Sequence, residues 1–330
     1  MCPVRGARRT YCGQRRRARH RKIRHTVPLP ASAPFRLRVA APRRDPPVKF
    51  LSLNAHSWCE ADQPAKIMDT ARLIVSEAVD VVALQEANQL QGGVPWRSEY
   101  FCGPSALAVG ADNYAQALAA ACAHLGEPYH CYWAEAHQGF GKYDEGVGVL
   151  VRRRVQPRPS ARARAVVLAD YAYEDVRRRV ALAVPVEGWG WVLSGHFSWW
   201  ASEGQQLFAR EWQAVEEFAK EHAGERICVL GDFNNPTTVE GEGYSLVRGL
   251  GWLDARDGAR EVAGHDTIPG RIVGWEQAQG GARIDYALVN HPVPVRSYRV
   301  VLDGVGSPVV SDHYGVLVEI EAQEKGTEEQ

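Results

Sequence analysis

The sequence lacks an apolar run of about 18 residues or more, the length that a membrane-spanning helix needs. It has no Cys-x-x-Cys pair, and its seven cysteines are scattered and odd in number, which is atypical of a disulfide framework or a zinc cluster. A Gly-x-x-x-x-Gly-Lys-Ser/Thr phosphate loop and a His-Glu-x-x-His motif are also absent. We therefore expect a protein without a membrane span, with reduced cysteines and a cytoplasmic location.

The formal net charge is zero, because 39 basic residues balance 39 acidic ones, but the charges are unevenly distributed along the chain. Residues 1–47 carry 14 basic side chains and one acidic side chain, which leaves 25 basic and 38 acidic residues in the remainder. An acidic surface repels a polyanion unless cations offset it. The charge distribution therefore favours a small substrate with bound cations over nucleic acid as the partner.

The first 47 residues read as a leader rather than as part of a folded domain. They are rich in arginine and proline, and no apolar stretch follows Arg15–Arg17, so a secretory signal is not indicated. Residues 1–47 could be a disordered basic arm, a targeting segment or the result of a start codon assigned too early, and we favour the first and the third interpretation over a nucleic-acid-binding arm. Residues 48–320 are predicted to form the domain, and 321–330 a frayed tail.

From Val48 onward, short apolar runs alternate with segments of helical periodicity. Helices are predicted after Asp62, around 114–125 and around 207–219, from the spacing of their apolar residues. Two runs joined around Glu187-Gly188 form a hairpin, which a purely parallel sheet would not need. The pattern is therefore mixed α/β, with two packed sheets and helices outside. The predicted strands are 48–54, 79–84, 146–151, 180–186, 189–194, 227–230, 284–289, 298–302 and 316–320.

Polar residues that can bind metal or phosphate recur next to these strands. Each one alone has an ordinary explanation: a glutamate after a strand is usually a loop residue, and a histidine on an apolar strand is usually a core residue. The ordered set is more specific, because buried strands would carry all of them to one rim. The set comprises Asn54, Glu86, His196, Asp232, Asn234, Asp285, Asp312 and His313.

These segments, which read V-V-A-L-Q-E, W-V-L-S-G-H, G-D-F-N-N, R-I-D-Y and S-D-H-Y-G, resemble the motifs of the endonuclease/exonuclease/phosphatase (deoxyribonuclease I-like) superfamily from Val48 to Ile320. The resemblance implies a four-layer α/β/β/α sandwich of two mixed sheets, with the active site at one rim. It also implies a hydrolase of phosphoric esters that depends on a divalent cation, Mg²⁺ or alternatively Mn²⁺. Carboxylate oxygens are the ligands that such a hard cation prefers.

The resemblance implies a role for each matching residue. Glu86, Asn54 and Asp312 would bind the metal, and Asn54 would also orient the phosphate. Asp232 would position or deprotonate the attacking water, and Asn234 would contact a phosphate oxygen. The histidines His196 and His313 would act on the phosphate, the second of them held by Asp285 in the tautomer that acid–base chemistry requires.

One segment departs from the pattern of the superfamily's apurinic-site endonucleases, which read Asn-x-Asp after the first strand. Here the segment is Asn54-Ala55-His56, so one carboxylate is missing. This difference argues against a two-metal reaction on abasic DNA. His56 is left as a residue that contacts metal or substrate, or as a structural histidine.

Tryptophan-rich segments point to the substrate. N-A-H-S-W, G-H-F-S-W-W, G-E-G-Y and G-R-I-V-G-W together resemble a bacterial branch that includes maltose 6′-phosphate phosphatases. Aromatic faces pack on sugar rings, so Trp199, Trp200 and Trp275, with Trp58, are candidates for a substrate wall or, alternatively, core residues. Arg178, in the run Arg177–Arg179, is a candidate phosphate ligand, and the segment Lys142–Gly146 could bring a further ligand to the rim.

We therefore favour a phosphomonoesterase for a small sugar phosphate. The alternatives are a phosphodiesterase, either a nuclease or a sphingomyelinase-like lipase, and a binding protein that has lost catalysis. A nuclease should present a basic groove, and a lipase should present exposed apolar loops.

Overall fold

The computed structural model describes residues 47–155, 162–200 and 205–321. All of them belong to one compact unit, which spans Pro42–Gln330. Except for Pro47 and Glu321, the predicted leader and tail lie outside the described residues. No helix in the described ranges is both long enough and apolar enough to cross a membrane.

The larger sheet has eight strands in the order β11-β13-β14-β1-β2-β5-β3, and β4 pairs with β5 beside this path. β1 pairs in parallel with β2 and antiparallel with β14, so the sheet is mixed. The strands are β1 (Val48–Asn54), β2 (Val81–Gln85), β3 (Gln89–Leu90), β4 (Tyr129–Gly139), β5 (Tyr143–Arg152), β11 (Glu261–Ala263), β13 (Val295–Val301) and β14 (Gly315–Ile320).

The second sheet has six strands in the order β10-β12-β9-β8-β7-β6. It is also mixed, because β8 and β9 are parallel while β7 pairs antiparallel with β8 through the predicted hairpin. The strands are β6 (Arg164–Ala169), β7 (Arg179–Val186), β8 (Gly190–His196), β9 (Ile227–Asp232), β10 (Leu253–Asp254) and β12 (Asp285–Val289).

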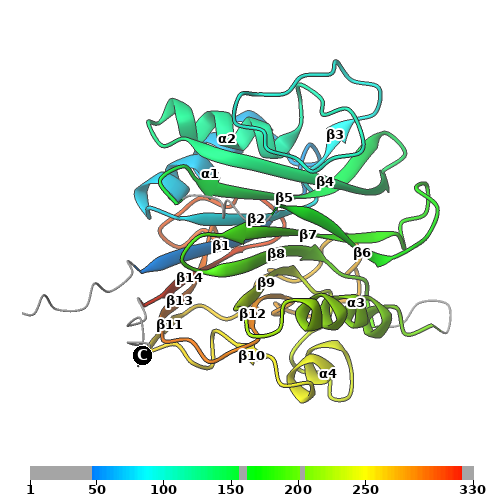
Figure 1. Cartoon of the computed structure of the whole chain (residues 1–330), viewed down its shortest axis with the longest axis vertical. Helices are drawn as coiled ribbons and strands as arrows, with labels where there is room; N and C mark the ends of the chain where they lie inside the picture. Colours follow the sequence, from blue (N-terminus) through cyan, green and yellow to red (C-terminus); the bar gives the residue numbers. More distant parts are fainter. Residues whose placement is uncertain (1–46, 156–161, 201–204, 322–330) are drawn as a thin grey trace, which may run out of the picture. The chain divides into compact units, whose positions relative to one another are not determined.

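The two sheets pack face to face, and helices cover their outer faces (Figure 1). Helices α1 (Gln63–Ser76) and α2 (Tyr114–His124) pack on the larger sheet, while α3 (Leu207–Glu221) and α4 (Gly243–Gly249) pack on the smaller one. One core lies between the sheets, and one lies under each helical layer. The predicted four-layer α/β/β/α sandwich is therefore confirmed.

Successive side chains of a strand point to opposite faces of its sheet and so contribute to two of these cores. In β7, Val180, Leu182 and Val184 face the other sheet, while Ala181 and Ala183 lie under α3, and all five are buried. α3 carries its apolar residues at helical spacing and buries Trp212 against the outer face of the smaller sheet. Burying one large apolar side chain of this kind contributes about 1.5–3 kcal/mol.

Several elements differ from the prediction. β4 was missed, although its sequence alternates: Tyr129, Cys131 and Trp133 face α2, while Tyr132 and Ala134 face the second sheet. Both sets are apolar, because the strand is buried on both faces, and this hides the polar alternation of an ordinary half-exposed strand. The strand β6 and the short helix α4 were also missed.

The start of α1 also differs in detail. Asp62 is the N-cap residue, as predicted, but it lies in the left-handed region with φ of 52° and its side chain makes no capping hydrogen bond. Among the five cysteines that the structure describes, all free, Cys122, Cys131 and Cys228 are buried as expected of small apolar residues. Cys59 and Cys102 are exposed, contrary to that expectation.

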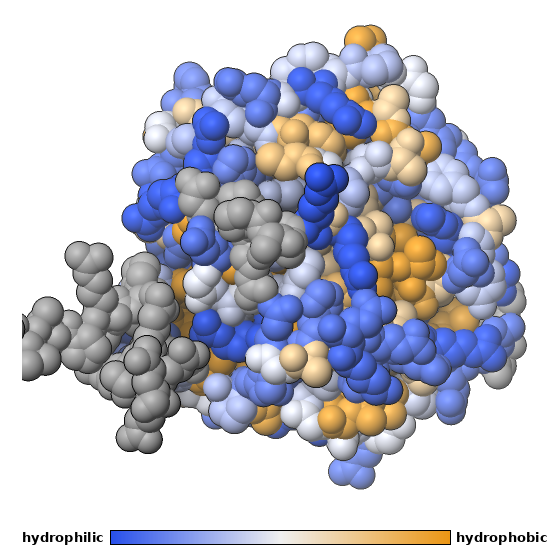
Figure 2. All heavy atoms as spheres, in the orientation of Figure 1, coloured by the Kyte–Doolittle hydropathy of each residue, from blue (hydrophilic) through white to orange (hydrophobic). Residues whose placement is uncertain are grey.

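The surface is mixed in character. Figure 2 shows that hydrophilic residues dominate the face seen in Figure 1, and that apolar residues form separate patches between them. This is the usual distribution on a globular domain, because polar groups alone cannot cover its surface.

The topology brings the ends of several strands to one rim. Because β1 and β2 are parallel and in register, Asn54 lies opposite Gln85, directly before Glu86. β8 and β9 are also parallel, and they end together at His196 and Asp232. β12 runs antiparallel to β9 and begins there, with Asp285 opposite Asp232.

Candidate active site

Asn54 connects the two sheets at this rim. Its fully buried amide Nδ2 donates to Glu86 Oε1 at 2.9 Å and to Asp232 Oδ2 at 3.0 Å, which belong to different sheets. Its Oδ1 accepts the backbone N–H of His56 at 3.1 Å. Asn54 therefore holds two carboxylates side by side, and the oxygen that was predicted to bind metal already has a donor.

Three residues of the rim have backbones in the left-handed region. The φ angles are 47° for Glu86, 40° for His56 and 50° for Asn234. Such conformations cost about 1–3 kcal/mol each for a residue other than glycine, and they concentrate at functional sites. The turn that follows β2 thus orients the Glu86 carboxylate at the expense of local stability.

Asp232, His313 and Asp285 form a buried array. His313 Nδ1 lies 3.0 Å from Asp285 Oδ2, and its Nε2 lies 3.7 Å from Asp232 Oδ2. Burial opposes the charge on the imidazole, but the carboxylates of Asp285 and Asp232 outweigh it and raise the pKa of His313 to about 10. His313 is therefore an imidazolium at neutral pH, with Asp285 fixing its ring.

His196 has the opposite protonation state. Burial, helped by the positive charge of Arg179, lowers the pKa of His196 to about 4, so the ring is neutral. Asn234 Nδ2 lies 3.2 Å from His196 Nε2, and since an amide N–H can only donate, the ring proton is on Nδ1. The indole Nε1 of Trp275 donates to Asn234 Oδ1 at 3.0 Å and thereby fixes the amide orientation.

Close packing of glycines places His196 beside Asp232. Gly195 and Gly231 are opposite each other in the β8–β9 pair. A Cβ on Gly231 would lie 1.9 Å from the carbonyl oxygen of Gly195. Only glycine at position 231 permits the approach that brings the two site residues together.

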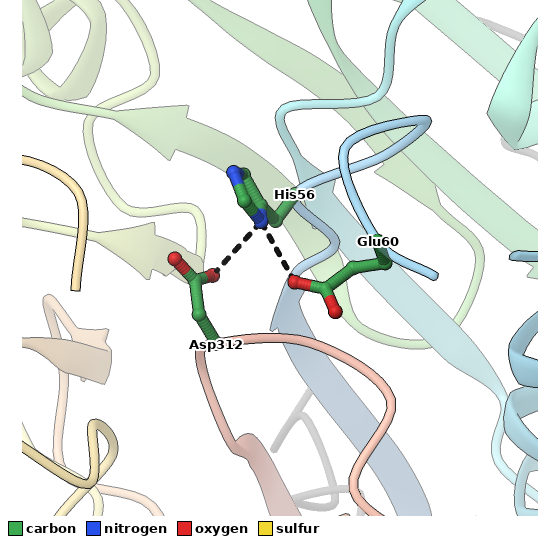
Figure 3. A group of neighbouring side chains, drawn as sticks. All are labelled: His56, Glu60 and Asp312. Atoms are coloured by element: carbon green, nitrogen blue, oxygen red, sulfur yellow. Dashed lines mark hydrogen bonds and ion pairs between the residues drawn. The ribbon is translucent and has the colours of Figure 1, made fainter. Parts of the chain in front are cut away.

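His56, Glu60 and Asp312 form a second group at the rim (Figure 3). His56 Nδ1 lies 2.7 Å from Glu60 Oε1 and 3.6 Å from Asp312 Oδ1, and Lys66 pairs with the other oxygen of Glu60. Burial lowers the pKa of His56, but the hydrogen bond to Glu60 and the charge of Asp312 leave it raised. These three side chains are close enough to share one cation.

The site residues open into a pocket of about 290 Å³. Its floor is acidic and imidazole-rich, and its mouth carries the exposed apolar side chains of Phe140, Val176, Trp199 and Val273. Of the predicted site residues, those that line it are Glu86, His56, His196, Trp199, Asp232, Asn234, Asp312 and His313. Asn54 and Asp285 lie behind these residues and hold them by hydrogen bonds.

Three further ionisable residues of the lining were not individually assigned to the site from the sequence. They are His137, Glu145 and Arg179. His137 and Glu145 are opposite each other in the β4–β5 hairpin, with His137 Nε2 3.5 Å from Glu145 Oε1. Recognising β4 from its alternation would have placed His137 at the rim. Glu145 lies in the Lys142–Gly146 segment that was expected to bring a ligand there.

Two predicted substrate residues do not line this pocket. Arg178 donates to the carbonyl oxygen of Ala136 and lies over the ring of Tyr173. Its assignment assumed that strand alternation extends to position 178, but β7 begins at Arg179 and Arg178 closes a turn with Asp175. Trp200 packs against the core under α3 instead.

The other two tryptophans of the predicted wall also lie outside the pocket lining. Trp275 acts on the site indirectly, through its hydrogen bond to Asn234. Trp58 packs edge-on against Tyr114 in the core beneath α1 and α2, and its indole donates to the backbone of Asn88. Trp199 alone among the four contributes to the pocket mouth.

The electrostatics of the floor favour a bound cation. Burial raises the pKa of Glu86, and the neighbouring charge of Glu145 raises it further. Burial likewise raises the pKa of Asp232. A cation between carboxylates relieves both costs, and hard oxygen donors suit a divalent ion. Glu86 and Asp312, two of the predicted metal ligands, both line the pocket, and Asp312 also belongs to the His56–Glu60–Asp312 group.

The group Asp232–Asp285–His313 is also close enough to share an ion. In this group the carboxylates of Asp285 and Asp232 favour the protonated form of His313. Such an array is suited to moving protons and to binding an anion.

His137 gives a stability prediction that depends on pH. Burial lowers the pKa of His137 to about 4, so the folded protein keeps it neutral while the unfolded chain takes up a proton near pH 6.5. A depressed histidine pKa means that stability is lost as pH falls from about 6.5 to 4. Replacing His137 with asparagine should remove this loss, because the amide can still donate to Arg178 O as Nδ1 does.

The measurement is urea unfolding of both proteins at pH 7 and pH 5. Between these pH values the stability of His137→Asn relative to the wild type should rise by about 2 kcal/mol. His124→Asn, near the end of α2 on the surface, is the control for replacing a histidine outside the pocket. If the stability of His137→Asn and that of the wild type changed equally between pH 7 and pH 5, a neutral buried His137 would be contradicted.

Comparison with known proteins agrees with the geometry. The Endonuclease/Exonuclease/phosphatase family matches residues 53–313. An endonuclease/exonuclease/phosphatase family protein from Leptotrichia buccalis is 26% identical, with a TM-score of 0.71 over 83% of this chain and 99% of that one. No curated protein matches the sequence.

Two more distant structures share the fold. The mannosyl-6-phosphatase Bt3783 of Bacteroides thetaiotaomicron aligns with a TM-score of 0.58 at 14% identity, covering 83% of this chain and 99% of that one. Truncated TDP2 from Caenorhabditis elegans aligns with a TM-score of 0.52 at 15% identity, covering 84% and 98%. The family match spans most of the chain, including every strand end that forms the pocket, and the chain therefore belongs to the Endonuclease/Exonuclease/phosphatase family of phosphoester hydrolases.

Proposed function

We propose that this protein is a divalent-metal-dependent phosphomonoesterase that acts on a small sugar phosphate. The observation that carries this proposal is the composition of the pocket, which has a charged floor and an apolar mouth. The floor holds four carboxylates, Glu86, Glu145, Asp232 and Asp312, and would repel a phosphate unless a cation were present. Mg²⁺ is the cation that suits oxygen ligands of this kind, and Mn²⁺ is the alternative.

Glu86 and Asp312 would hold the cation, with His56 and Asn54 keeping the carboxylates in place. When bound, the cation supplies positive charge to the phosphoryl oxygens and favours ionisation of a water. Asp232 is placed to accept a proton from the attacking water, since burial raises its pKa and Asn54 orients its Oδ2. His313 as imidazolium, held by Asp285, would stabilise the charge that develops on the phosphate.

The neutral His196 and Asn234 would orient the phosphate from the other side of Asp232. Asn234 is fixed by its bonds to Trp275 and to the Phe197 carbonyl oxygen, so its position costs little reorganisation during the reaction. In this proposal the catalytic residues are the five expected from the sequence: Asp232, Asn234, His196, His313 and Asp285.

The mouth of the pocket supports a substrate whose leaving group has an apolar face. Trp199 is 39% exposed and lines the mouth with Phe140, Val176 and Val273. The faces of sugar rings carry C–H groups that pack on indole rings, while their hydroxyls remain free to bond water. The Trp199 ring lies against position 274, where a Cβ would come within 2.6 Å of it, so Gly274 fixes how the loop 270–276 meets Trp199.

A phosphodiesterase is the second candidate. The exposed apolar mouth also fits a lipid phosphodiester. A nuclease has less support, because Arg179 is the one lysine or arginine among the described lining residues and nucleic-acid binding needs several.

The test is release of inorganic phosphate from a panel of hexose and disaccharide phosphates in the presence of Mg²⁺ or Mn²⁺, repeated after chelation. Metal-dependent release from sugar phosphates supports the proposal. Cleavage confined to sphingomyelin or bis-(p-nitrophenyl) phosphate would replace it with the lipid or general phosphodiesterase, and cleavage confined to DNA would replace it with a nuclease.

Trp199 provides a prediction specific to the sugar. Trp199→Ala should raise KM for a sugar phosphate by about 2- to 10-fold, the effect of losing roughly 0.5–1.5 kcal/mol of ring packing, with kcat little changed. For p-nitrophenyl phosphate at the same metal concentration, whose small ring reaches less of the mouth, the rise in KM should be smaller. Trp96→Ala is the control, because Trp96 is similarly exposed but does not line the pocket. Equal KM changes for both substrates would count against a sugar site at Trp199.

A further inference from the structure

Three consecutive arginines precede or begin β7, and they have different environments. Arg177 pairs with Asp175 at 2.7 Å, and Arg178 donates to a carbonyl oxygen of β4. Arg179 is only 5% exposed and lines the pocket beside His137 and His196. The first two arginines thus have structural partners, and the third faces the site.

Among the residues that the structure describes, none forms a hydrogen bond or an ion pair with the Arg179 guanidinium. Its Nε is buried without a hydrogen bond. Glu145, the acid across the pocket, is placed near His137 and His196 at 3.5 and 3.6 Å, and among the described residues no carboxylate forms an ion pair with Arg179. Burying an uncompensated charge costs several kcal/mol, so a fold that keeps one at a pocket wall is expected to use it for a charged ligand.

The charge of Arg179 affects the pKa values of Glu211, His196 and His137, and none of these groups forms an ion pair with it. Glu211 of α3 is fully buried, and its Oε2 accepts the Ser198 backbone N–H at 2.8 Å. Its other oxygen, Oε1, has no partner. Burial raises the pKa of Glu211, and the charge of Arg179 opposes that rise without forming an ion pair. His196 is kept neutral partly by Arg179, and it likewise leaves the guanidinium charge unbalanced.

The chemistry of the guanidinium selects the ligand. Arginine presents a rigid planar fork of N–H donors, which matches two oxygens of one phosphate group. Arg179 lines the same pocket as Asp232 and His313, where the reacting phosphate would lie. A terminal phosphate is also the better match in charge, because a monoester dianion offers three non-bridging oxygens and a diester monoanion only two.

We propose that Arg179 is the phosphate-binding arginine of this site and that its buried fork favours the terminal phosphate of a monoester over a diester. The inference rests on the proposed function and deepens it by naming the residue that recognises the phosphate. Arg179 takes the position that the sequence had suggested for its neighbour Arg178.

The experiment compares Arg179→Met, Arg179→Lys and the control Arg177→Gln with the wild type. The probe is inorganic phosphate in the presence of Mn²⁺, with its dissociation constant measured by calorimetry and its effect on Tm measured by thermal unfolding. Arg179→Met should weaken phosphate binding by about 10- to 100-fold, the range for losing a charge-assisted hydrogen bond. Arg179→Lys should recover part of this loss, and Arg177→Gln should bind as the wild type does.

Stability separates a binding role from a structural one. Because Arg179 has no hydrogen-bond or ion-pair partner within residues 47–155, 162–200 and 205–321, Arg179→Met should unfold at the same temperature as the wild type or higher in phosphate-free buffer, and added phosphate should raise its Tm less. A lower Tm together with unchanged phosphate affinity in Arg179→Lys would overturn the proposal. If Arg179→Met fails to fold, the affinity of Arg179→Lys alone decides, and wild-type affinity there overturns it.

The outcomes also separate this inference from the proposed function. Phosphate binding that depends on Arg179, in a protein that hydrolyses no monoester, would leave the inference standing and end the proposed function. If the protein hydrolyses sugar phosphates, and both Arg179 variants keep the wild-type KM and phosphate affinity, the proposed function stands and the inference about Arg179 is overturned. Equal losses for dimethyl phosphate and inorganic phosphate in Arg179→Met would overturn the preference for a terminal phosphate.

Discussion

Asp232→Asn is expected to lower kcat/KM by about 10²- to 10⁴-fold, the range for removing a positioned base or electrostatic element. Asparagine keeps the shape of the side chain and can still accept the Asn234 backbone N–H, which now bonds Asp232 Oδ1 at 2.9 Å. It cannot take a proton from water, and it removes one of the three negative charges that favour the protonated form of His313. The loss should therefore fall mainly on kcat.

The matched control for this variant is Asp80→Asn. Asp80 is also a buried aspartate whose pKa burial raises, but it lies next to the opposite ends of β1 and β2 and accepts the Lys49 backbone N–H. That variant should lose some stability and keep its turnover per folded molecule. Steady-state kinetics with the best substrate of the panel gives both values. A kcat within 10-fold of the wild type for Asp232→Asn would remove Asp232 from the role assigned to it.

Glu86→Gln is expected to have an effect of similar size, through the cation rather than the proton. Glutamine can still accept from Asn54 Nδ2 as Glu86 Oε1 does at 2.9 Å, so the rim should keep its shape. The lost carboxylate charge should weaken Mn²⁺ binding by more than 10-fold and lower kcat/KM by about 10²- to 10³-fold at moderate metal concentration. Removing metal from the wild type with a chelator should produce a comparable loss.

Metal binding can be measured without activity, from the rise in Tm that Mn²⁺ causes in the absence of substrate. The wild type and the control Glu77→Gln should both show this rise, since Glu77 pairs with Arg299 and Lys49 at the end of α1 rather than at the rim. Glu86→Gln should show little or none. A full Mn²⁺-induced rise in Glu86→Gln would mean that the cation is held elsewhere, with the His56–Glu60–Asp312 group as the first place to look.

The residues outside the pocket explain why the pocket holds its shape. Asn54, Asp285 and Trp275 each donate or accept a hydrogen bond that fixes a lining residue. Together with the positive φ angles at Glu86 and Asn234, these bonds pre-orient groups that would otherwise relax apart. A rim built in this way fits a reaction whose acceleration comes from positioning and charge.

The sequence alone determined the family, the sandwich and most of the rim. Apolar runs that end in a single polar residue, as at Asn54, Glu86, His196 and Asp232, predict strands whose ends meet, because parallel neighbours share an edge. Strand periodicity is a local property of the sequence, and it can be recognised without knowing which strands pair. The order of these motifs along the chain then indicated the fold, which the structure confirms.

Only the tertiary structure decided which neighbouring residue faces the pocket. Arg179 rather than Arg178 lines it, because the strand starts at residue 179 and alternation counts only from there. His137 and Glu145 meet across a hairpin with a register shift between Glu135 and His137, which no local pattern specifies. The protonation states of His196 and His313 likewise depend on burial and on charges from distant segments, and these arise only when the two sheets are packed together.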